Sequence, residues 1–256
     1  MQLALRSVYD DQTVKPDEIV VVFDGPLTGE LYSVLDAFRS GKESFVFYCP
    51  LEENVGLGEA LRIGTGYCTG DWIFRMDADD ISDARRFERQ IAYIREHPEC
   101  DVVGTDIAEF QISADEPYIR RRVCPADHAG ILKMAKHRTP VNHVSAAIKK
   151  EALLRCGGYI SLPLLEDYYL WLRMLSQGCV FSNIHESLVH VRIGNGFLQK
   201  RRRSARIKGW KTLQRFMLDH KMISRPAAWA NMVYVFLFTT MPSGLKKWAY
   251  KRALRK

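Results

Sequence analysis

Short apolar runs alternate with longer amphipathic stretches over the first hundred residues. The apolar runs predict strands at residues 18–24, 45–49 and 72–76, and a fourth strand that begins at residue 101. Between them, apolar residues recur at helical spacing and predict helices at about 28–39, 54–68 and 85–97. Strands that alternate with helices of this length predict βαβ units, and therefore an α/β fold with a mostly parallel sheet flanked by helices.

The pattern becomes mixed after residue 105. Short strands are predicted at 107–110, 118–123, 145–148, 180–184 and 187–192, and a helix is predicted at about 166–177. Beyond residues 194–196 the composition changes to a basic, helical stretch that continues to residue 256. The sequence contains no internal repeat and no low-complexity segment.

The composition excludes several classes of protein. Of the 256 residues, 47% are apolar and 26% are charged, so the chain can bury enough surface to offset the entropy of ordering, which excludes disorder. Ordinary numbers of glycine and proline exclude a collagen-like chain. The six cysteines lie far apart without a C-x-x-C pair, which favours reduced thiols in a cytosolic compartment over a zinc site or a disulfide framework.

Charge is distributed unevenly over the chain, although the net charge is only +7. Residues 200–256 contain 16 Lys or Arg and one acidic residue, Asp219, which leaves 21 basic and 29 acidic residues in the rest of the chain. A mildly acidic body with a strongly basic tail predicts two surfaces with different partners.

The basic tail contains a 20-residue uncharged run, residues 226–245, between its clusters of cations. A membrane-spanning helix requires about 20 apolar residues. This run has the length, but it is interrupted by Pro226, Asn231 and the segment 242–244. We expect the tail to lie on the anionic cytoplasmic leaflet, since residues 246–252 mix cations with aromatics. The alternative is a C-terminal helix that packs on the body. No nucleic-acid partner is expected, because the acidic body lacks a recognised binding module.

Two of the predicted strands lead into aspartates, where α/β sheets bind their ligands. The first ends in Asp24, and the third runs into Asp77, Asp79 and Asp80. Three carboxylates in four residues repel one another unless a cation lies among them. Mg²⁺ or Mn²⁺ prefers oxygen ligands and bridges to substrate phosphates, so either ion is a candidate. A solvated acidic turn is the alternative, because aspartate is common in turns.

Three further segments contain candidate functional residues, each with a structural alternative. Glu166 and Asp167 begin a predicted helix, where acidic residues either complement the helix dipole or serve as a general base. The stretch 54–58 has two glycines before a helix, which is typical of a phosphate-facing turn but equally of simple loop geometry. His143 is a candidate substrate-binding residue, and an isolated histidine is also common as a structural residue.

Taken together and in this order, these segments resemble glycosyltransferase family 2 of the GT-A fold, in particular the bacterial exopolysaccharide and lipopolysaccharide sugar transferases. The resemblance covers about residues 3–195. The matching segments are Gln12-Thr13 with residues 15–22, Asp24-Gly25-Pro26, residues 54–58, Arg75-Met76-Asp77-Ala78-Asp79-Asp80-Ile81-Ser82 with Arg86-Phe87-Glu88, Gly157-Gly158-Tyr159 and residues 166–173.

The resemblance implies a role for each acidic candidate. It implies that Asp24 contacts the uracil ring of the donor, and that Asp77 and Asp79 form the D-x-D motif that touches the ribose and holds the divalent metal. Asp80 is implied as a further metal ligand. Asp167 matches the catalytic base. The implied reaction is inverting transfer from a nucleotide-diphosphate sugar, and the implied donor is UDP-linked.

The resemblance also implies the remaining sites and the domain organisation. Asn54, Glu166 and His143 are candidate donor- or substrate-binding residues. Residues 1–105 would bind the nucleotide sugar, residues 106–196 would form the acceptor and catalytic half of the same domain, and residues 197–256 would form the basic, membrane-associating tail. The implied acceptor is a lipid-linked glycan of surface-polysaccharide biosynthesis, with the enzyme peripheral on the cytoplasmic face of the inner membrane.

The sequence departs from the family pattern in three places. Family members begin with a central strand before the helix that starts here near Leu3, so we expect about twenty family residues, including that strand, to have no counterpart here. The alternative function that follows is a catalytically impaired sugar-nucleotide-binding or scaffold protein. Arg62 stands in place of a common asparagine and Val144 in place of a usual proline, and both bear on specificity.

Overall fold

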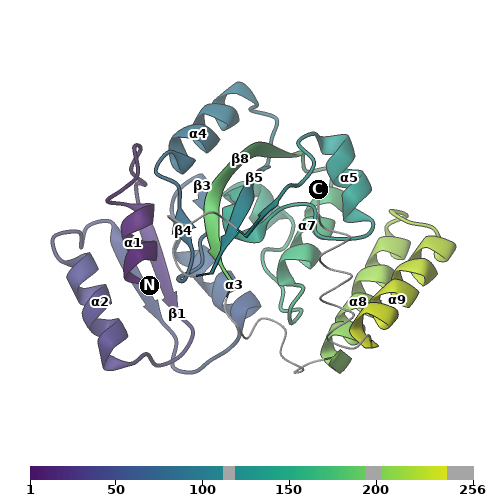
Figure 1. The fold of residues 1–256 in the computed structure, drawn as a ribbon, viewed down its shortest axis with the longest axis horizontal. Coiled ribbons are helices and arrows are strands. Elements are labelled where there is room, and N and C mark those ends of the chain that lie inside the picture. The colour runs from purple at the N-terminus through teal and green to yellow at the C-terminus, as the bar shows by residue number, and fades with distance from the viewer. Residues whose placement is uncertain (112–118, 194–202, 241–256) are drawn as a thin grey trace. The chain divides into compact units, whose positions relative to one another are not determined.

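The computed structural model describes residues 1–111, 119–193 and 203–240. The chain divides into two compact units, one made of residues 1–162 and 166–198 and the other of residues 163–165 and 199–256. Figure 1 shows the elements in chain order from purple to yellow. The helices are α1 (Gln2–Val8), α2 (Gly29–Arg39), α3 (Leu57–Tyr67), α4 (Arg86–Glu96), α5 (His128–Ala135), η1 (a 3₁₀ turn, His143–Ser145), α6 (Lys150–Arg155), α7 (Glu166–Ser176), α8 (Arg203–Asp219) and α9 (Arg225–Thr240).

The strands form two sheets in the first unit. They are β1 (Ile19–Phe23), β2 (Val46–Pro50), β3 (Trp72–Phe74), β4 (Ile81–Ser82), β5 (Val102–Phe110), β6 (Arg120–Arg122), β7 (Ala147–Lys149) and β8 (Phe181–Arg192). β1 and β2 pair in parallel as a two-stranded sheet. The larger sheet has the order β3-β7-β5-β8-β4, with β6 paired to β5.

The small sheet packs with α1 and α2 around its own apolar cluster. Leu5 from α1, Leu35 and Phe38 from α2, Phe23 from β1 and Val46 from β2 are buried together. Figure 1 shows α1, α2 and β1 at one side of the unit, with α4 and α7 around the larger sheet. Among the described residues β1 pairs only with β2, and β3 pairs only with β7, so no backbone pairing joins the two sheets.

The α/β class is confirmed, but the prediction of a mostly parallel sheet is wrong in its strand directions. Only β1–β2 and β5–β8 are parallel, whereas β3–β7, β5–β7, β5–β6 and β4–β8 are antiparallel. The helix–strand alternation that predicts parallel pairing holds for the first hundred residues. Beyond them, β6 is the next element that the structure describes after β5, and it pairs antiparallel with β5, as β7 does.

The two long strands were each predicted as two short ones. β5 and β8 pair along their length with register shifts at Thr105, Asp106 and Ile107. Thr105 and Asp106 are polar and interrupt the apolar pattern, yet both are fully buried. The Asp106 carboxylate accepts a hydrogen bond from Arg121 at 2.7 Å, which makes this burial tolerable. The helices predicted at 28–39, 54–68, 85–97 and 166–177 are confirmed with small shifts of their ends.

The predicted domain boundaries stay predictions. The boundary at 105/106 lies inside β5, and the boundary at 196/197 lies outside the described residues. In the second unit, α8 and α9 form a helical hairpin. Among the described residues, none of the helices has both the length and the apolar character that crossing a membrane requires.

Candidate active site

An acidic cluster follows β3 at its carboxyl end. Asp77, Asp79 and Asp80 each offer a carboxylate oxygen, and these oxygens lie within 4.8 Å of one another. The three side chains differ in exposure, since Asp80 is buried, Asp77 is half-buried and Asp79 is exposed. Three carboxylates at this separation form a donor set for a hard divalent cation, which prefers oxygen ligands and shares them with substrate phosphates.

Asp80 is the member of the cluster that burial perturbs most. Burial raises the pKa of Asp80 to about 7, and the neighbouring charges of Asp77 and Asp79 act in the same direction. The backbone N–H of Arg192, at the end of β8, donates to Asp80 Oδ1 at 2.9 Å and opposes this rise. A cation bound beside Asp80 would lower this pKa, because it favours the ionised form of the carboxyl group.

Two buried arginines lie behind the acidic cluster. The Arg75 guanidinium forms an ion pair with Asp77, and its Nε and Nη1 have no hydrogen-bond partner among the described residues. Arg86 is fully buried; it donates from Nη2 to the Arg75 carbonyl at 2.8 Å and from Nε to Gln90 Oε1 at 3.0 Å. Burial and the charge of Arg75 lower the pKa of Arg86 to about 9. These contacts anchor the backbone from which the acidic cluster projects.

Asp24 holds the loop before α3 in place. Its carboxylate accepts hydrogen bonds from the backbone N–H of Val55 at 2.7 Å and of Gly56 at 3.1 Å, and Asn54 Nδ2 donates to its carbonyl at 3.1 Å. Gly25 has a φ of +99°, and a Cβ there would lie 3.1 Å from the Asn54 backbone nitrogen. The structure therefore brings Asp24 and Asn54 together, in contacts that shape the loop.

The two acidic residues at the start of α7 have different surroundings. Glu166 is buried against α3, where a Cβ on Gly58 would lie 2.9 Å from Glu166 Cγ. Asp167 is half-buried, and its Oδ2 accepts a long hydrogen bond from Thr139 at 3.5 Å. Burial raises the pKa of Asp167, while the charges of Arg122 and Arg75 oppose that rise. A carboxylate with a raised pKa accepts a proton readily and is suited to general-base catalysis.

His143 belongs to a buried aromatic group rather than to an open surface. Its Nε2 lies 2.9 Å from the Tyr159 hydroxyl, and its ring makes an edge contact with Trp171 at 5.9 Å. Burial, together with the charge of Arg75, holds the pKa of His143 well below its usual range, so the ring is neutral at pH 7. This environment supports a structural role for His143 as well as a binding role.

Arg75 connects these groups electrostatically. It pairs with Asp77, and its positive charge also acts on Asp80, His143, Tyr159 and Asp167. The predicted metal ligands and the predicted base therefore share one charged region, near the carboxyl end of β3 and the start of α7. Asp24 lies at the carboxyl end of β1, and Asn54 lies in the loop between β2 and α3; Gly58 of α3 lies against Glu166.

The sequence patterns assigned no role to three residues of this site. Arg75 reads as an exposed residue of a strand end, and only its position two residues before the acidic cluster could have signalled its importance. Tyr159 follows two glycines and is buried beside His143. Arg192 holds Asp80 through its backbone, and its guanidinium stacks over the Phe110 ring at 4.7 Å.

Comparison with known proteins identifies a family. The profile described as "Glycosyl transferase family 2" matches residues 2–157. An uncharacterized glycosyltransferase of Haemophilus influenzae is 37% identical over 248 residues, which cover 96% of this chain and 90% of that protein. The UDP-Gal:alpha-D-GlcNAc-diphosphoundecaprenol beta-1,3-galactosyltransferase of Escherichia coli is 32% identical, over 99% of this chain and 90% of that protein.

Solved structures with the same fold are more distant in sequence. TarS (1–349) of S. aureus in complex with UDP has a TM-score of 0.67 at 14% identity, covering 97% of this chain and 70% of that one. The chain spans 40% of a longer TarS polypeptide. The mannosyltransferase PcManGT of Pyrobaculum calidifontis, in complex with GDP-Man and Mn²⁺, has a TM-score of 0.60 at 15% identity, covering 96% of this chain and 73% of that one. Both similarities concern the fold.

Proposed function

Because this chain belongs to glycosyltransferase family 2 and is a transferase enzyme, we propose that it moves a sugar from a UDP-linked donor to a lipid-linked glycan. The transfer is inverting, uses Mg²⁺ or Mn²⁺, and serves the synthesis of a surface polysaccharide. The observation that carries this proposal is the cluster of Asp77, Asp79 and Asp80. Arg75 forms an ion pair with Asp77 of this cluster, and its positive charge also acts on Asp167.

The donor and the acceptor are inferred from relatives. The E. coli relative is named for a UDP-linked galactose donor and a diphosphoundecaprenol-linked acceptor, and TarS, with the same fold, binds UDP. As the family resemblance implies, Asp24, after β1, contacts the nucleobase, and Asn54, after β2, is a candidate for a further contact to the donor. Glu166 and His143 are the further candidates for contacts to the donor or the acceptor.

The acidic cluster fits a divalent cation. Its three carboxylates supply oxygen ligands, and Asp79 is exposed, which leaves room for ligands from the substrate. PcManGT, which shares the fold, binds Mn²⁺. A divalent ion bound there supplies positive charge to the diphosphate and so lowers the cost of its departure. Asp77, held by Arg75, and Asp80, held by the backbone of Arg192, need little rearrangement to serve as ligands.

Asp167 acts as the general base. It removes the proton of the acceptor hydroxyl, and the acceptor oxygen forms a bond to the anomeric carbon while the bond from that carbon to the diphosphate oxygen breaks. The electron pair of the broken bond leaves with UDP, and the proton remains on Asp167. Attack from the face opposite the leaving group inverts the anomeric carbon, and no covalent intermediate is required.

Incubation of the enzyme with UDP-sugars, Mn²⁺ and a diphosphate-lipid-linked acceptor tests the proposal. We expect turnover that stops when EDTA is added and returns with Mn²⁺, and a product whose anomeric configuration by NMR is opposite to that of the donor. Retained configuration, or turnover that EDTA leaves unchanged, contradicts the proposal. Binding of UDP without turnover on any acceptor favours the alternative, a sugar-nucleotide-binding or scaffold protein.

A further inference from the structure

α9 is mostly apolar, with large apolar side chains on several sides, which is unusual for a helix at a protein surface. After Arg225 it carries no charged residue. Ala228 and Val235 are buried, but large apolar side chains on other sides of the helix are exposed: Trp229 by 71%, Tyr234 by 67%, Phe236 by 56% and Leu237 by 56%. A helix with apolar residues on all sides is normally buried, and a contiguous exposed apolar patch marks an interaction surface.

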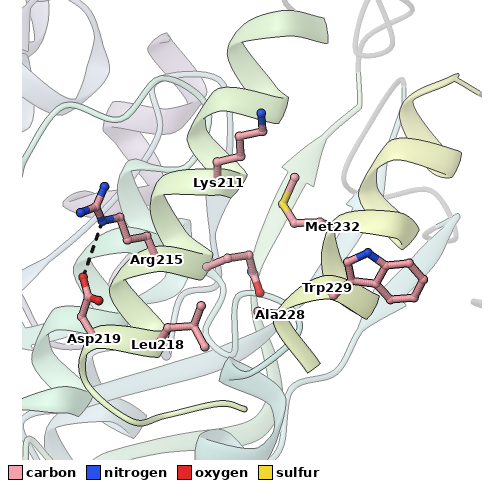
Figure 2. Close-up of a pocket in the computed structure, with 8 residues that line it drawn as sticks. Lys211, Arg215, Leu218, Asp219, Ala228, Trp229 and Met232 are labelled. Carbon is pink, nitrogen blue, oxygen red and sulfur yellow. Dashed lines mark ion pairs between the residues drawn. The ribbon is translucent and has the colours of Figure 1, made fainter. Parts of the chain in front are cut away.

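The neighbouring helix α8 places cations beside this apolar surface. Lys208, Lys211 and Arg215 are exposed and spaced by three and four residues, so they share one side of α8. Lys211 and Arg215 of α8 line a shallow groove together with Trp229 and Met232 of α9. In Figure 2, Met232 points toward α8, while the indole of Trp229 and the guanidinium of Arg215 point outward on opposite sides of the groove. Asp219, which also lines the groove, forms only a loose and exposed ion pair with Arg215 at 3.9 Å.

The two helices are held in register by a buried polar contact. Asn231 Nδ2 donates a hydrogen bond to Gln214 Oε1 at 3.0 Å, between buried residues of α9 and α8. A buried hydrogen bond of this kind penalises sliding of one helix along the other, because sliding would leave its polar groups unpaired. The contact therefore fixes how Trp229, on the groove side of α9, lies relative to Lys211 and Arg215 of α8.

We propose that this side of the hairpin lies on an anionic lipid surface. We call this side the hairpin face and define it by Lys208, Lys211, Arg215, Trp229, Met232 and Phe236. Phe236 lies two helical turns beyond Trp229. Trp229 and Phe236 enter the boundary between headgroups and acyl chains, and the cations meet lipid phosphates, which is the arrangement of interfacial helices. The proposal deepens and rests on the proposed function, whose lipid-linked acceptor resides in such a surface.

The length and charge of the hairpin favour lipid over other occupants. With 16 residues, α9 is about 24 Å long, shorter than the hydrocarbon core of a bilayer, so it lies along the surface rather than crossing it. A second copy of the chain is a poorer fit, because a two-fold contact through the hairpin face would bring Lys211 and Arg215 close to the same cations of the partner. Residues 246–252, whose cations and aromatics predict a membrane contact, lie outside the described residues.

Vesicle co-sedimentation of the full chain tests the proposal. Vesicles of phosphatidylcholine with about one-third phosphatidylglycerol are compared with pure phosphatidylcholine. We expect at least tenfold stronger binding to the anionic vesicles. W229Q/F236Q should weaken it at least tenfold, and K208Q/K211Q should weaken it by about fivefold per cation removed. The matched controls are L154Q, which replaces a 52% exposed residue of α6, and K133Q, an exposed cation of α5; both should bind like the wild type.

Each outcome bears on the proposal. Binding by W229Q/F236Q that equals that of the wild type overturns it, as does equal loss in L154Q. A dimer in analytical ultracentrifugation that dissociates in W229Q/F236Q also overturns it in favour of a second copy. UDP affinity by calorimetry and helicity by circular dichroism are measured for every variant. Lipid binding without UDP binding would defeat the proposed function alone, whereas UDP binding without lipid binding would defeat only this inference.

Discussion

The two units of the molecule depart from the usual pattern of burial in opposite ways. The first unit places charged groups inside, among them Arg75, Arg86 and Asp80, each less than a tenth exposed. The hairpin does the reverse and exposes the large apolar side chains Trp229 and Phe236. Buried charged groups suit a site that binds a metal ion and a diphosphate. Exposed apolar side chains suit a surface that becomes buried when it binds a partner. The difference indicates that the two units serve different partners.

Each of these buried charged groups has at least one ion-pair or hydrogen-bond partner. Arg75 pairs with Asp77, Arg86 donates to the Arg75 carbonyl and to Gln90, and Asp80 accepts from the backbone of Arg192. A buried charge without a partner is very costly, so removal of one member of this network would destabilise the members that remain. Trp229 and Phe236 of α9 remain exposed, and the inference that they contact lipid would account for this exposure. The following changes test this contrast.

Loss of a metal ligand should have the largest effect on binding. D79A removes the exposed carboxylate of the acidic cluster, which by its exposure can contact both ion and substrate. We expect Mn²⁺-dependent UDP affinity, measured by calorimetry, to fall by at least about 100-fold, since even indirect supports of metal ligands are worth 10–100-fold. The control D71A changes an exposed aspartate just before β3 and should bind normally. Unchanged titration of D79A would remove Asp79 from the metal site.

A buried arginine should matter far more to folding than an exposed one. R86M leaves the Arg75 carbonyl and Gln90 Oε1 without their donor, so we expect the free energy of unfolding to fall by about 3 kcal/mol. R85M changes the adjacent exposed arginine, and F236Q changes an exposed residue of the hairpin; each should stay within about 0.5 kcal/mol of the wild type. Urea titration measures all three. Equal losses in R86M and R85M would contradict the contrast.

The polar contact inside the hairpin should have an intermediate effect on local stability. N231L leaves Gln214 buried without its partner and should cost about 1–2 kcal/mol, whereas Q214L/N231L removes both polar groups and should recover most of that loss. Hydrogen exchange of the α8 and α9 amides reports the change, with amides of β5 as the internal reference. No recovery in the double variant would mean that the pair does not act as a unit.

A shift in pH dependence should be the smallest effect. The charge of Arg122 lowers the pKa of Asp167, which must be ionised to accept a proton, so activity rises as pH increases through that pKa. R122Q removes this charge and raises the pKa of Asp167, and the acidic limb of the rate profile should move to higher pH. R95Q, an exposed change on α4, is the control. A shift toward lower pH in R122Q would contradict the assignment.

Much of the fold follows from local patterns in the sequence. The helical spacing at 28–39, 54–68, 85–97 and 166–177 predicted four helices, because amphipathic periodicity persists over three turns in each. Strand direction and continuity did not follow. Whether β6 and β7 run parallel or antiparallel to β5 depends on pairing between distant segments. The polar residues Thr105 and Asp106 interrupt the apolar pattern of the sequence, although β5 continues through them.

The candidate site could be predicted in part. Asp77, Asp79 and Asp80 form a cluster because they are adjacent in sequence, and Asp24 and Asn54 meet because their strands are neighbours. The roles of Arg75 and Tyr159 depend on burial created by segments far apart in the chain, which local patterns do not report. The exposure of α9 is the opposite case, since an uncharged helical run alone predicts burial, and only the structure shows which residues remain exposed.

The transfer rate of D167N, set beside its affinity for UDP and Mn²⁺, tests the central claim most directly. Asparagine keeps the shape of the side chain but cannot accept the proton of the acceptor. The account predicts a loss of about 10³-fold in transfer, within the range of general-base catalysis, with nearly unchanged binding of UDP and Mn²⁺ by calorimetry. Transfer by D167N at the wild-type rate, with the same affinities, would contradict the assignment of Asp167 as the base.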